Sequence, residues 1–143
     1  MAKRIPNEVV EHFARIPLFQ DVSKQSLRKI VSAATEIDIR SGTVIVREGV
    51  SDRYLYVLIE GSAGVSRAGR KRDTIGPGEF FGELAFLDGG PRSATVTATA
   101  DSRLMILSPR EMDGVLRQEP GLAFQMICVL AGHLRAATNP TTG

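Results

Sequence analysis

The sequence has few of the residues on which disulfide formation, nucleic-acid binding and membrane insertion depend. It contains one cysteine, Cys128, which excludes an intrachain disulfide and makes a reducing cytoplasm the expected compartment. The formal net charge is +2, from 18 basic and 16 acidic residues, so no nucleic-acid contact is expected from this chain. No apolar run approaches the length of a membrane span, and no apolar segment follows the basic N-terminus as it would in a signal peptide.

Residue patterns typical of catalytic and metal sites are also scarce. The two histidines, His12 and His133, lie at opposite ends of the chain, so no cluster of metal ligands is expected on the strands. The sequence has neither the glycine-rich loop that holds nucleoside triphosphates nor a recognisable arrangement of serine, histidine and acid for nucleophilic catalysis. We therefore expect no enzyme, no metal and no cofactor.

The chain does contain a helical pattern at each end and a strand pattern between them. Apolar residues recur at helical spacing over residues 7–34 and again over residues 109–138. Residues 35–107 alternate with a period of two, in about eight short segments separated by glycine turns. This order predicts a single domain, residues 1–143, that is mainly β: an antiparallel β-roll or jelly roll with N-terminal helices and two C-terminal helices.

Several local features carry more specific expectations. Asn7, Ser23 and Ser108 each precede a helical segment and are expected to cap it, with Ser108 in a capping box. The basic run at residues 67–72 is expected to be a loop that forms the solvated tip of a hairpin and guards an edge strand. A surface for nucleic acid or an acidic partner is the weaker alternative, because no aromatic residues alternate with these charges.

The most informative stretch covers residues 80–96. An apolar run at residues 82–87 predicts a short helix, and Asp-Gly-Gly-Pro at residues 88–91 predicts a tight turn before Arg92. Free amides at the helix start, facing a guanidinium, predict a site for one phosphate. Glu83 would repel that anion unless it accepts a hydrogen bond from a hydroxyl of the same ligand, as ribose provides. The stretch predicts a mononucleotide site; the alternative is a hairpin with an ordinary ion pair between Glu83 and Arg92.

The same stretch resembles a known family. Phe-Gly-Glu-Leu-Ala, a short gap and Pro-Arg-Ser-Ala-Thr-Val are similar to the phosphate-binding cassette of cyclic nucleotide-binding domains, here residues 81–96. Such domains occur in catabolite-activator-type regulators, regulatory subunits of cyclic-AMP-dependent kinase and cyclic-nucleotide-gated channels. The resemblance implies that Glu83 binds the ribose 2′-hydroxyl and Arg92 the exocyclic phosphate oxygens. The other ligand-binding residues that it implies, several of them through backbone amides, are Gly82, Leu84, Ala85, Ser93 and Ala94.

The resemblance makes cyclic AMP the expected ligand and cyclic GMP the alternative. Ser93 follows the arginine where cyclic-GMP readers of the family often have threonine and many cyclic-AMP readers have alanine, and bacterial cyclic-AMP regulators also have serine. The expected function is a cytoplasmic regulatory domain that switches conformation on ligand binding. Its expected partners are a fused or associated effector domain or a second copy of the chain. The alternatives are the sensor part of a DNA-binding regulator or a channel, and a scaffold of the same fold that binds no nucleotide.

The last helix, expected over residues 122–137, is apolar on all sides and needs cover from more than one of them. The roll would cover one side, and a ligand base or a second subunit the other. The resemblance implies that this helix closes over the base and that His133 or Arg135 contacts it. His133 shares a helix face with Leu122, Met126 and Val129, so it is expected to point inward. The alternative is that His133 only packs and that Arg135 is a favourable charge at the helix end. Cys128 is expected in the core.

Overall fold

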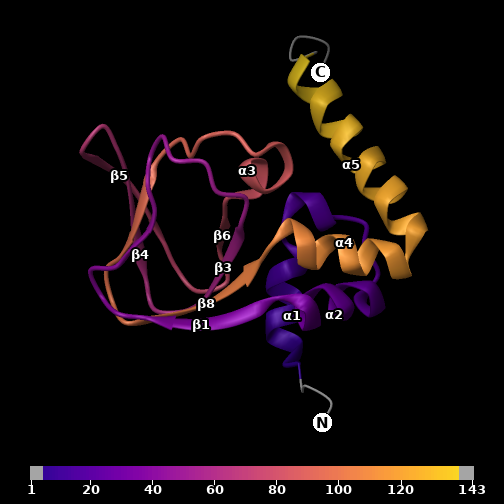
Figure 1. The fold of residues 1–143 in the computed structure, drawn as a ribbon, viewed down its shortest axis with the longest axis horizontal. Coiled ribbons are helices and arrows are strands. Elements are labelled where there is room, and N and C mark those ends of the chain that lie inside the picture. Colours follow the sequence, from indigo (N-terminus) through magenta and orange to yellow (C-terminus); the bar gives the residue numbers. More distant parts are fainter. Residues whose placement is uncertain (1–4, 139–143) are drawn as a thin grey trace.

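The computed structural model describes residues 5–138, and within them two antiparallel sheets form a roll with helices at one end (Figure 1). The first sheet has the order β1-β8-β3-β6, and the second has the order β2-β7-β4-β5. The strands are β1 (Thr35–Ile39), β2 (Val44–Val46), β3 (Leu55–Glu60), β4 (Ala63–Arg67), β5 (Arg70–Ile75), β6 (Phe80–Phe81), β7 (Thr95–Ala98) and β8 (Ser102–Leu107). This arrangement confirms the predicted antiparallel β-roll with flanking helices.

Helices precede, interrupt and follow the strands. They are α1 (Asn7–Ala14), the 3₁₀ turn η1 (Pro17–Phe19), α2 (Lys24–Ala33), α3 (Glu83–Asp88), α4 (Pro109–Gln118) and α5 (Pro120–Thr138). Two predicted caps are confirmed: the Ser23 hydroxyl accepts a hydrogen bond from the backbone N–H of Ser26, and Ser108 forms the capping box with Glu111.

The prediction that Asn7 caps the first helix is wrong. Pro6 occupies the cap position with an extended backbone, and Asn7 is the first helical residue. The side-chain oxygen of Asn7 instead accepts a hydrogen bond from Arg28 of α2 at 3.1 Å, so this amide joins two helices rather than ending one.

Two apolar cores hold the helices and sheets together, and β3 contributes to both. Because successive side chains of a strand point to opposite faces, Val57 packs toward the helices and Leu58 toward the interior of the roll. The helical core includes the stacked rings of Phe13 and Phe19, whose centroids lie 6.5 Å apart. The helices therefore form a second layer against a roll that is filled by its own side chains.

Residues 67–72 lie at the tip of a hairpin that ends in an edge strand, as predicted, but the loop is shorter than expected. β4 and β5 continue through most of this segment and are joined by a turn at Ala68 and Gly69, with φ of 53° and 76°. A tight hairpin turn of this kind needs two left-handed residues. Most of β5 is exposed at the edge of its sheet, so its polar side chains lack the alternation that reveals a strand in the sequence.

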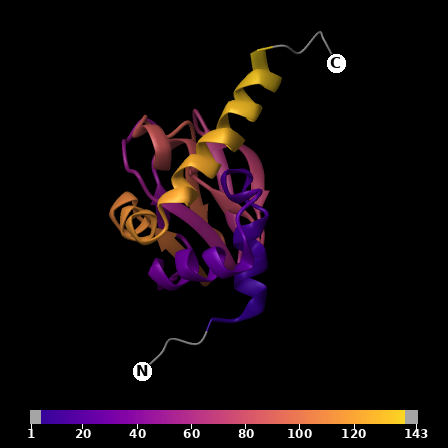
Figure 2. The ribbon, with the colours of Figure 1, turned by 90° about the vertical axis from the view of Figure 1, so that its right-hand side faces the viewer.

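Helix α5 leaves the body of the protein beyond its first half (Figures 1 and 2). Leu122, Met126 and Val129 are buried, whereas residues 131–138 are exposed. Cys128 is also exposed, so its predicted place in the core is wrong, because it lies on the side of α5 that faces solvent. By length and composition alone, α5 would be long and apolar enough to cross a bilayer, a test that core helices also pass. The expectation that no segment approaches a membrane span is therefore too strong for this helix.

Candidate functional site

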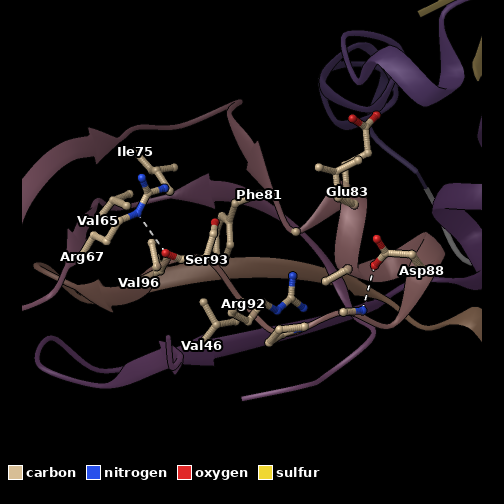
Figure 3. A pocket seen from close by; sticks show the side chains of 16 residues that line it. Val46, Val65, Arg67, Ile75, Phe81, Glu83, Asp88, Arg92, Ser93 and Val96 are labelled. Atoms are coloured by element: carbon tan, nitrogen blue, oxygen red, sulfur yellow. Dashed lines mark hydrogen bonds between the residues drawn. The ribbon is translucent and has the colours of Figure 1, made fainter. Parts of the chain in front are cut away.

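A cavity of about 490 Å³ lies between the predicted cassette and the second sheet (Figure 3). Its lining combines the segment from Phe81 to Val96 with side chains from β2, β4 and β5. One end carries the charged side chains of Glu83 and Asp88, and the other is lined mainly by valine and isoleucine, with Arg92 between the two ends (Figure 3). The cavity therefore offers separate environments to the polar and apolar parts of one ligand.

Gly82 lets the backbone turn from β6 into α3 directly against Arg92. Its φ is 90°, which favours glycine, and it occupies the N-cap position of α3. A Cβ atom at this position would lie 2.3 Å from Nη1 of Arg92 and 2.7 Å from the carbonyl oxygen of Tyr54. The predicted site residue Gly82 is thus required both by the turn and by the close approach of the guanidinium.

Arg92 is buried, with 6 % of its surface exposed, and its guanidinium is held from several sides. Nε donates to Oδ2 of Asp52 at 3.2 Å, and Nη2 contacts the other carboxylate oxygen of Asp52 and donates to the Tyr54 carbonyl oxygen at 2.6 Å. The guanidinium also lies over the ring of Tyr56, 5.6 Å from its centroid. These contacts orient Arg92 and leave Nη1 without a hydrogen-bond partner among residues 5–138.

Glu83 lines the same cavity but does not face Arg92. Its Oε2 accepts a hydrogen bond of 2.7 Å from the backbone N–H of Leu18 in η1, and in Figure 3 the carboxylate points away from the guanidinium. The alternative of an ordinary ion pair between Glu83 and Arg92 is therefore wrong, because each side chain has a different partner. Binding of a sugar hydroxyl by Glu83 remains a prediction.

The turn before Arg92 is anchored to the chain segment that precedes β3. Asp88 accepts a hydrogen bond from the backbone N–H of Gly90 at 2.7 Å, which closes the turn. The backbone N–H of Arg92 donates to the carbonyl oxygen of Val50 at 3.0 Å, and Arg53 donates to the carbonyl oxygen of Leu87 at 2.6 Å. The cassette is thus fixed on both sides of the turn.

The remaining predicted cassette residues also line the cavity. They are Leu84, Ala85, Ser93 and Ala94. Leu84 has 73 % of its surface exposed, which leaves an apolar side chain at the rim. The structure therefore brings together all seven residues predicted from the cassette, although their contacts with a ligand remain predictions.

His133 and Arg135 do not reach this cavity. Nε2 of His133 lies 3.2 Å from Oε1 of Gln20, and both His133 and Arg135 are exposed on α5. The prediction that His133 points inward is wrong, because the face shared by Leu122 and Met126 leaves the core before the helix reaches residue 133. A contact between either residue and a ligand base remains a prediction and would require α5 to move.

Sequence reasoning missed Asp52, Tyr56 and Arg67, which complete the surroundings of Arg92 and the cavity. Burial, together with the nearby charge of Asp52, raises the pKa of Tyr56 to about 12, so the phenol stays neutral. The ring of Tyr56 stacks on Phe81 with centroids 4.9 Å apart. Asp52 lies in the segment between β2 and β3, forty residues before Arg92 in the sequence, so no local spacing identifies it as the partner. Arg67 lies two residues after Val65 on β4, and residues two apart on a strand share a face. The strand period therefore places Arg67 on the side of β4 that Val65 turns toward the cavity.

Comparison with known proteins identifies the family. Residues 36–119 match the cyclic nucleotide-binding domain, and the chain belongs to this family. A cyclic nucleotide-gated potassium channel of Mesorhizobium japonicum is 36% identical over 110 residues, which are 77% of this chain and 30% of the channel. A CRP-like cAMP-activated global transcriptional regulator of Mycobacterium tuberculosis is 28% identical over 134 residues, 90% of this chain and 60% of the regulator.

A solved structure agrees with this assignment. The N-terminal domain of a transcriptional regulator from Streptomyces coelicolor superimposes with a TM-score of 0.82 at 27% identity, over 90% of this chain and 94% of that domain. The chain therefore spans less than two thirds of its full-length relatives and nearly all of an isolated domain of one regulator.

Proposed function

We propose that this domain binds cyclic AMP in the cavity beside Arg92 and acts as a cytoplasmic regulatory sensor for an effector domain. The observation that carries the proposal is a buried, oriented arginine at the wall of a 490 Å³ cavity. A regulator among the relatives is described as cAMP-activated, and another relative is a cyclic nucleotide-gated channel. Either kind of effector, joined to the domain or assembled with it, fits the proposal.

Arg92 is the proposed phosphate-binding residue. Asp52 and the Tyr54 carbonyl oxygen hold one side of its guanidinium, and Nη1 lies against the backbone of Gly82. A guanidinium that is already oriented loses little conformational freedom when it binds an anion. A cyclic phosphate carries a single negative charge and can accept charge-assisted hydrogen bonds from Nη1, the nitrogen of Arg92 that Asp52 does not contact.

Glu83 is the proposed link between the ligand and α5. Its carboxylate holds η1 through the N–H of Leu18. The residues that follow η1 in turn contact α5, because Gln20 bonds to His133 and the carbonyl oxygen of Asp21 accepts from Gln125. A sugar hydroxyl that competes for Glu83 would weaken the hold on η1 and, through it, on α5. The ligand would then favour a different position of α5.

The same movement gives a role to the exposed apolar side chains. Phe124, Ile127 and Leu134 are exposed on α5, and Leu84 is exposed at the rim of the cavity. A displaced α5 would cover part of this apolar surface by closing over the ligand base, where His133 and Arg135 are the proposed contacts. Pairing with α5 of a second copy would cover it in a dimer.

Titration calorimetry with cyclic AMP tests the proposed binding. A hydrogen bond to a charged group contributes about 1.5–3 kcal/mol, so Arg92→Ala should weaken binding by about one to two orders of magnitude. Arg72→Ala, which removes the same charge from exposed β5, is the matched control and should bind like the parent. Glu83→Ala should reduce the preference for cyclic AMP over its 2′-deoxy analogue. A parent protein that binds no cyclic nucleotide would establish the alternative, a scaffold of the same fold.

A further inference from the structure

The outer side of β5 is an unpaired sheet edge. β5 ends the strand order β2-β7-β4-β5, and among residues 5–138 no strand pairs with its other side. Its residues from Arg70 to Thr74 are exposed, and only Ile75 is buried. In Figure 1 the hairpin of β4 and β5 lies at the opposite end of the roll from α4 and α5, so a partner bound there would not meet these helices. An unpaired edge offers backbone N–H and C=O groups to an extended segment of another chain.

The positive charge at this edge is not balanced within the domain. Of the 18 basic and 16 acidic residues, four basic and no acidic ones lie at residues 67–72, which leaves the rest of the chain with a net charge of −2. None of these four side chains forms an ion pair with another residue of the described range 5–138. Arg67 and Arg70 lie directly opposite each other in the register of β4 and β5, where like charges repel and are destabilising. A carboxylate bound beside them would offset this repulsion.

The carboxylates that contact the hairpin have other partners. Asp73, the one acidic residue of β5, accepts a hydrogen bond at Oδ1 from the backbone N–H of Thr74 at 2.8 Å. Glu48 accepts at Oε1 from the backbone N–H of Ala68 at 2.9 Å, which holds the turn. Charged side chains protect a sheet edge from aggregation, but that protection needs no opposed pair of like charges. The cations of β5 therefore exceed what edge protection requires.

We propose that the outer edge of β5 binds an acidic segment of a partner protein, which adds a strand to the second sheet. The backbone of the segment pairs with the free N–H and C=O groups of β5 over about six residues, the length of this strand. Its carboxylates accept charge-assisted hydrogen bonds from Arg70, Lys71 and Arg72. These three side chains lie outside the lining of the cavity, so the inference does not depend on nucleotide binding.

Other anionic partners fit this edge less well. Residues 67–75 contain no aromatic side chain on which the bases of a nucleic acid could stack. The turn at Ala68 and Gly69 offers no large apolar side chain for insertion into an anionic membrane. The acidic edge strand β1 of a second copy is also less suited, because its carboxylates at Glu36 and Asp38 already pair with Arg103.

Titration calorimetry with the synthetic peptide acetyl-Thr-Glu-Val-Glu-Val-Glu-Thr-amide tests the charge requirement. Arg70→Glu combined with Arg72→Glu should weaken binding by about tenfold or more relative to the parent. This variant places a carboxylate opposite Arg67, so its thermal stability should not fall. Lys24→Glu combined with Arg110→Glu is the matched control, because it reverses two exposed charges at helix starts, and it should bind like the parent.

Two N-methylated forms of the peptide test the addition of a strand. Only every second amide of a strand faces its neighbour, so methylation of one alternating set of amides should abolish binding and methylation of the other set should not. Binding of both methylated peptides would show that charge attraction alone is at work and would overturn the inference. Equal binding by the parent and the β5 double variant, or no binding of the peptide to the parent, would overturn it as well.

Parallel titrations complete the test. A single-stranded oligonucleotide or phosphatidylserine vesicles that bind the parent more tightly than the peptide does would identify a different class of partner and would contradict the inference. Cyclic AMP should bind the β5 double variant with the affinity of the parent, because Arg70 and Arg72 do not line the cavity. The proposed function therefore stands or falls independently of the result at this edge.

Discussion

Arg92 and the second half of α5 lie at opposite extremes of this domain. The arginine is buried and held by a carboxylate, a carbonyl oxygen and an aromatic ring. The end of α5 is exposed over residues 131–138, and His133 anchors it through a side-chain contact to Gln20. The comparison separates a buried side chain with a fixed orientation, the proposed phosphate-binding residue, from a helix end that has few contacts with the rest of the domain. The proposed sensor needs both, because a ligand shifts a conformational equilibrium only when it binds one conformation more tightly than the other.

Gly82→Ala should have the largest effect on binding and stability, because the new side chain would push against the buried guanidinium of Arg92. The new Cβ would lie 2.3 Å from Nη1 of Arg92, and the backbone φ of 90° is unfavourable for alanine. We expect calorimetry to detect no nucleotide binding and thermal unfolding to occur at a lower temperature. Gly114→Ala in α4 is the control, since no atom lies within 4 Å of its Cβ position, and it should stabilise the protein by about 0.5–1 kcal/mol. Nucleotide binding by Gly82→Ala with the affinity of the parent would show that binding does not require the guanidinium of Arg92 to pack against the backbone of residue 82.

Asp52→Ala should have the next largest effect, because it leaves the buried guanidinium of Arg92 without its carboxylate. We expect the free energy of unfolding in urea to fall by about 1–3 kcal/mol. Asp38→Ala removes a carboxylate from an exposed pair with Arg103 and should produce no resolvable change. Equal losses in the two variants would contradict the distinction between a buried, oriented arginine and surface ion pairs.

Changes at the anchors of α5 should affect stability little. Gln125→Ala and His133→Ala each remove one side-chain contact to the segment after η1 and should change the free energy of unfolding by less than about 0.5 kcal/mol. Amide exchange in the second half of α5 should accelerate in both variants, while exchange in β3 stays the same. A loss of stability as large as that of Asp52→Ala would show that α5 belongs to the rigid part.

Ionisation of Tyr56 should give the smallest effect, visible only at high pH. Burial raises its pKa from about 10 to about 12 in the folded state, so the unfolded chain loses this proton first. Stability should therefore fall as pH rises through this interval and should fall less in Tyr56→Phe. Absorbance at 295 nm, compared between the parent and Tyr56→Phe, measures the titration directly. A Tyr56 that titrates near pH 10 would contradict the burial of its ring between Phe81 and Arg92.

The parts of the fold that were predicted correctly are those with a local signal. Strand periodicity and glycine turns gave the β-roll, the serine caps gave two helix starts, and the cassette motif located the cavity wall. The edge strand β5 was predicted only around Thr74 and Ile75, and its start at Arg70 was assigned to a loop because the side chains there are polar on both faces. Asn7 and Cys128 were misplaced because a single residue type does not determine whether a side chain meets a cap, a neighbouring helix or solvent.

The contacts that orient the site depend on tertiary structure and could not be predicted. Glu83 and Leu18 are 65 residues apart, and Arg92 and Asp52 are 40 residues apart, so no spacing rule connects them. The point at which α5 leaves the core could not be predicted either. Its periodicity places Leu122 and Met126 on one face but does not show how far along the helix that face stays buried. The sequence therefore located the residues of the site but not their partners.

A crystal structure of the domain with cyclic AMP would test the central claim most directly. We predict that the phosphate lies within hydrogen-bond distance of Nη1 of Arg92, that the ribose hydroxyl bonds to Glu83, and that the bond between Glu83 and Leu18 is broken or lengthened. Cyclic AMP bound outside the cavity, or a phosphate that does not contact Arg92, would contradict the account.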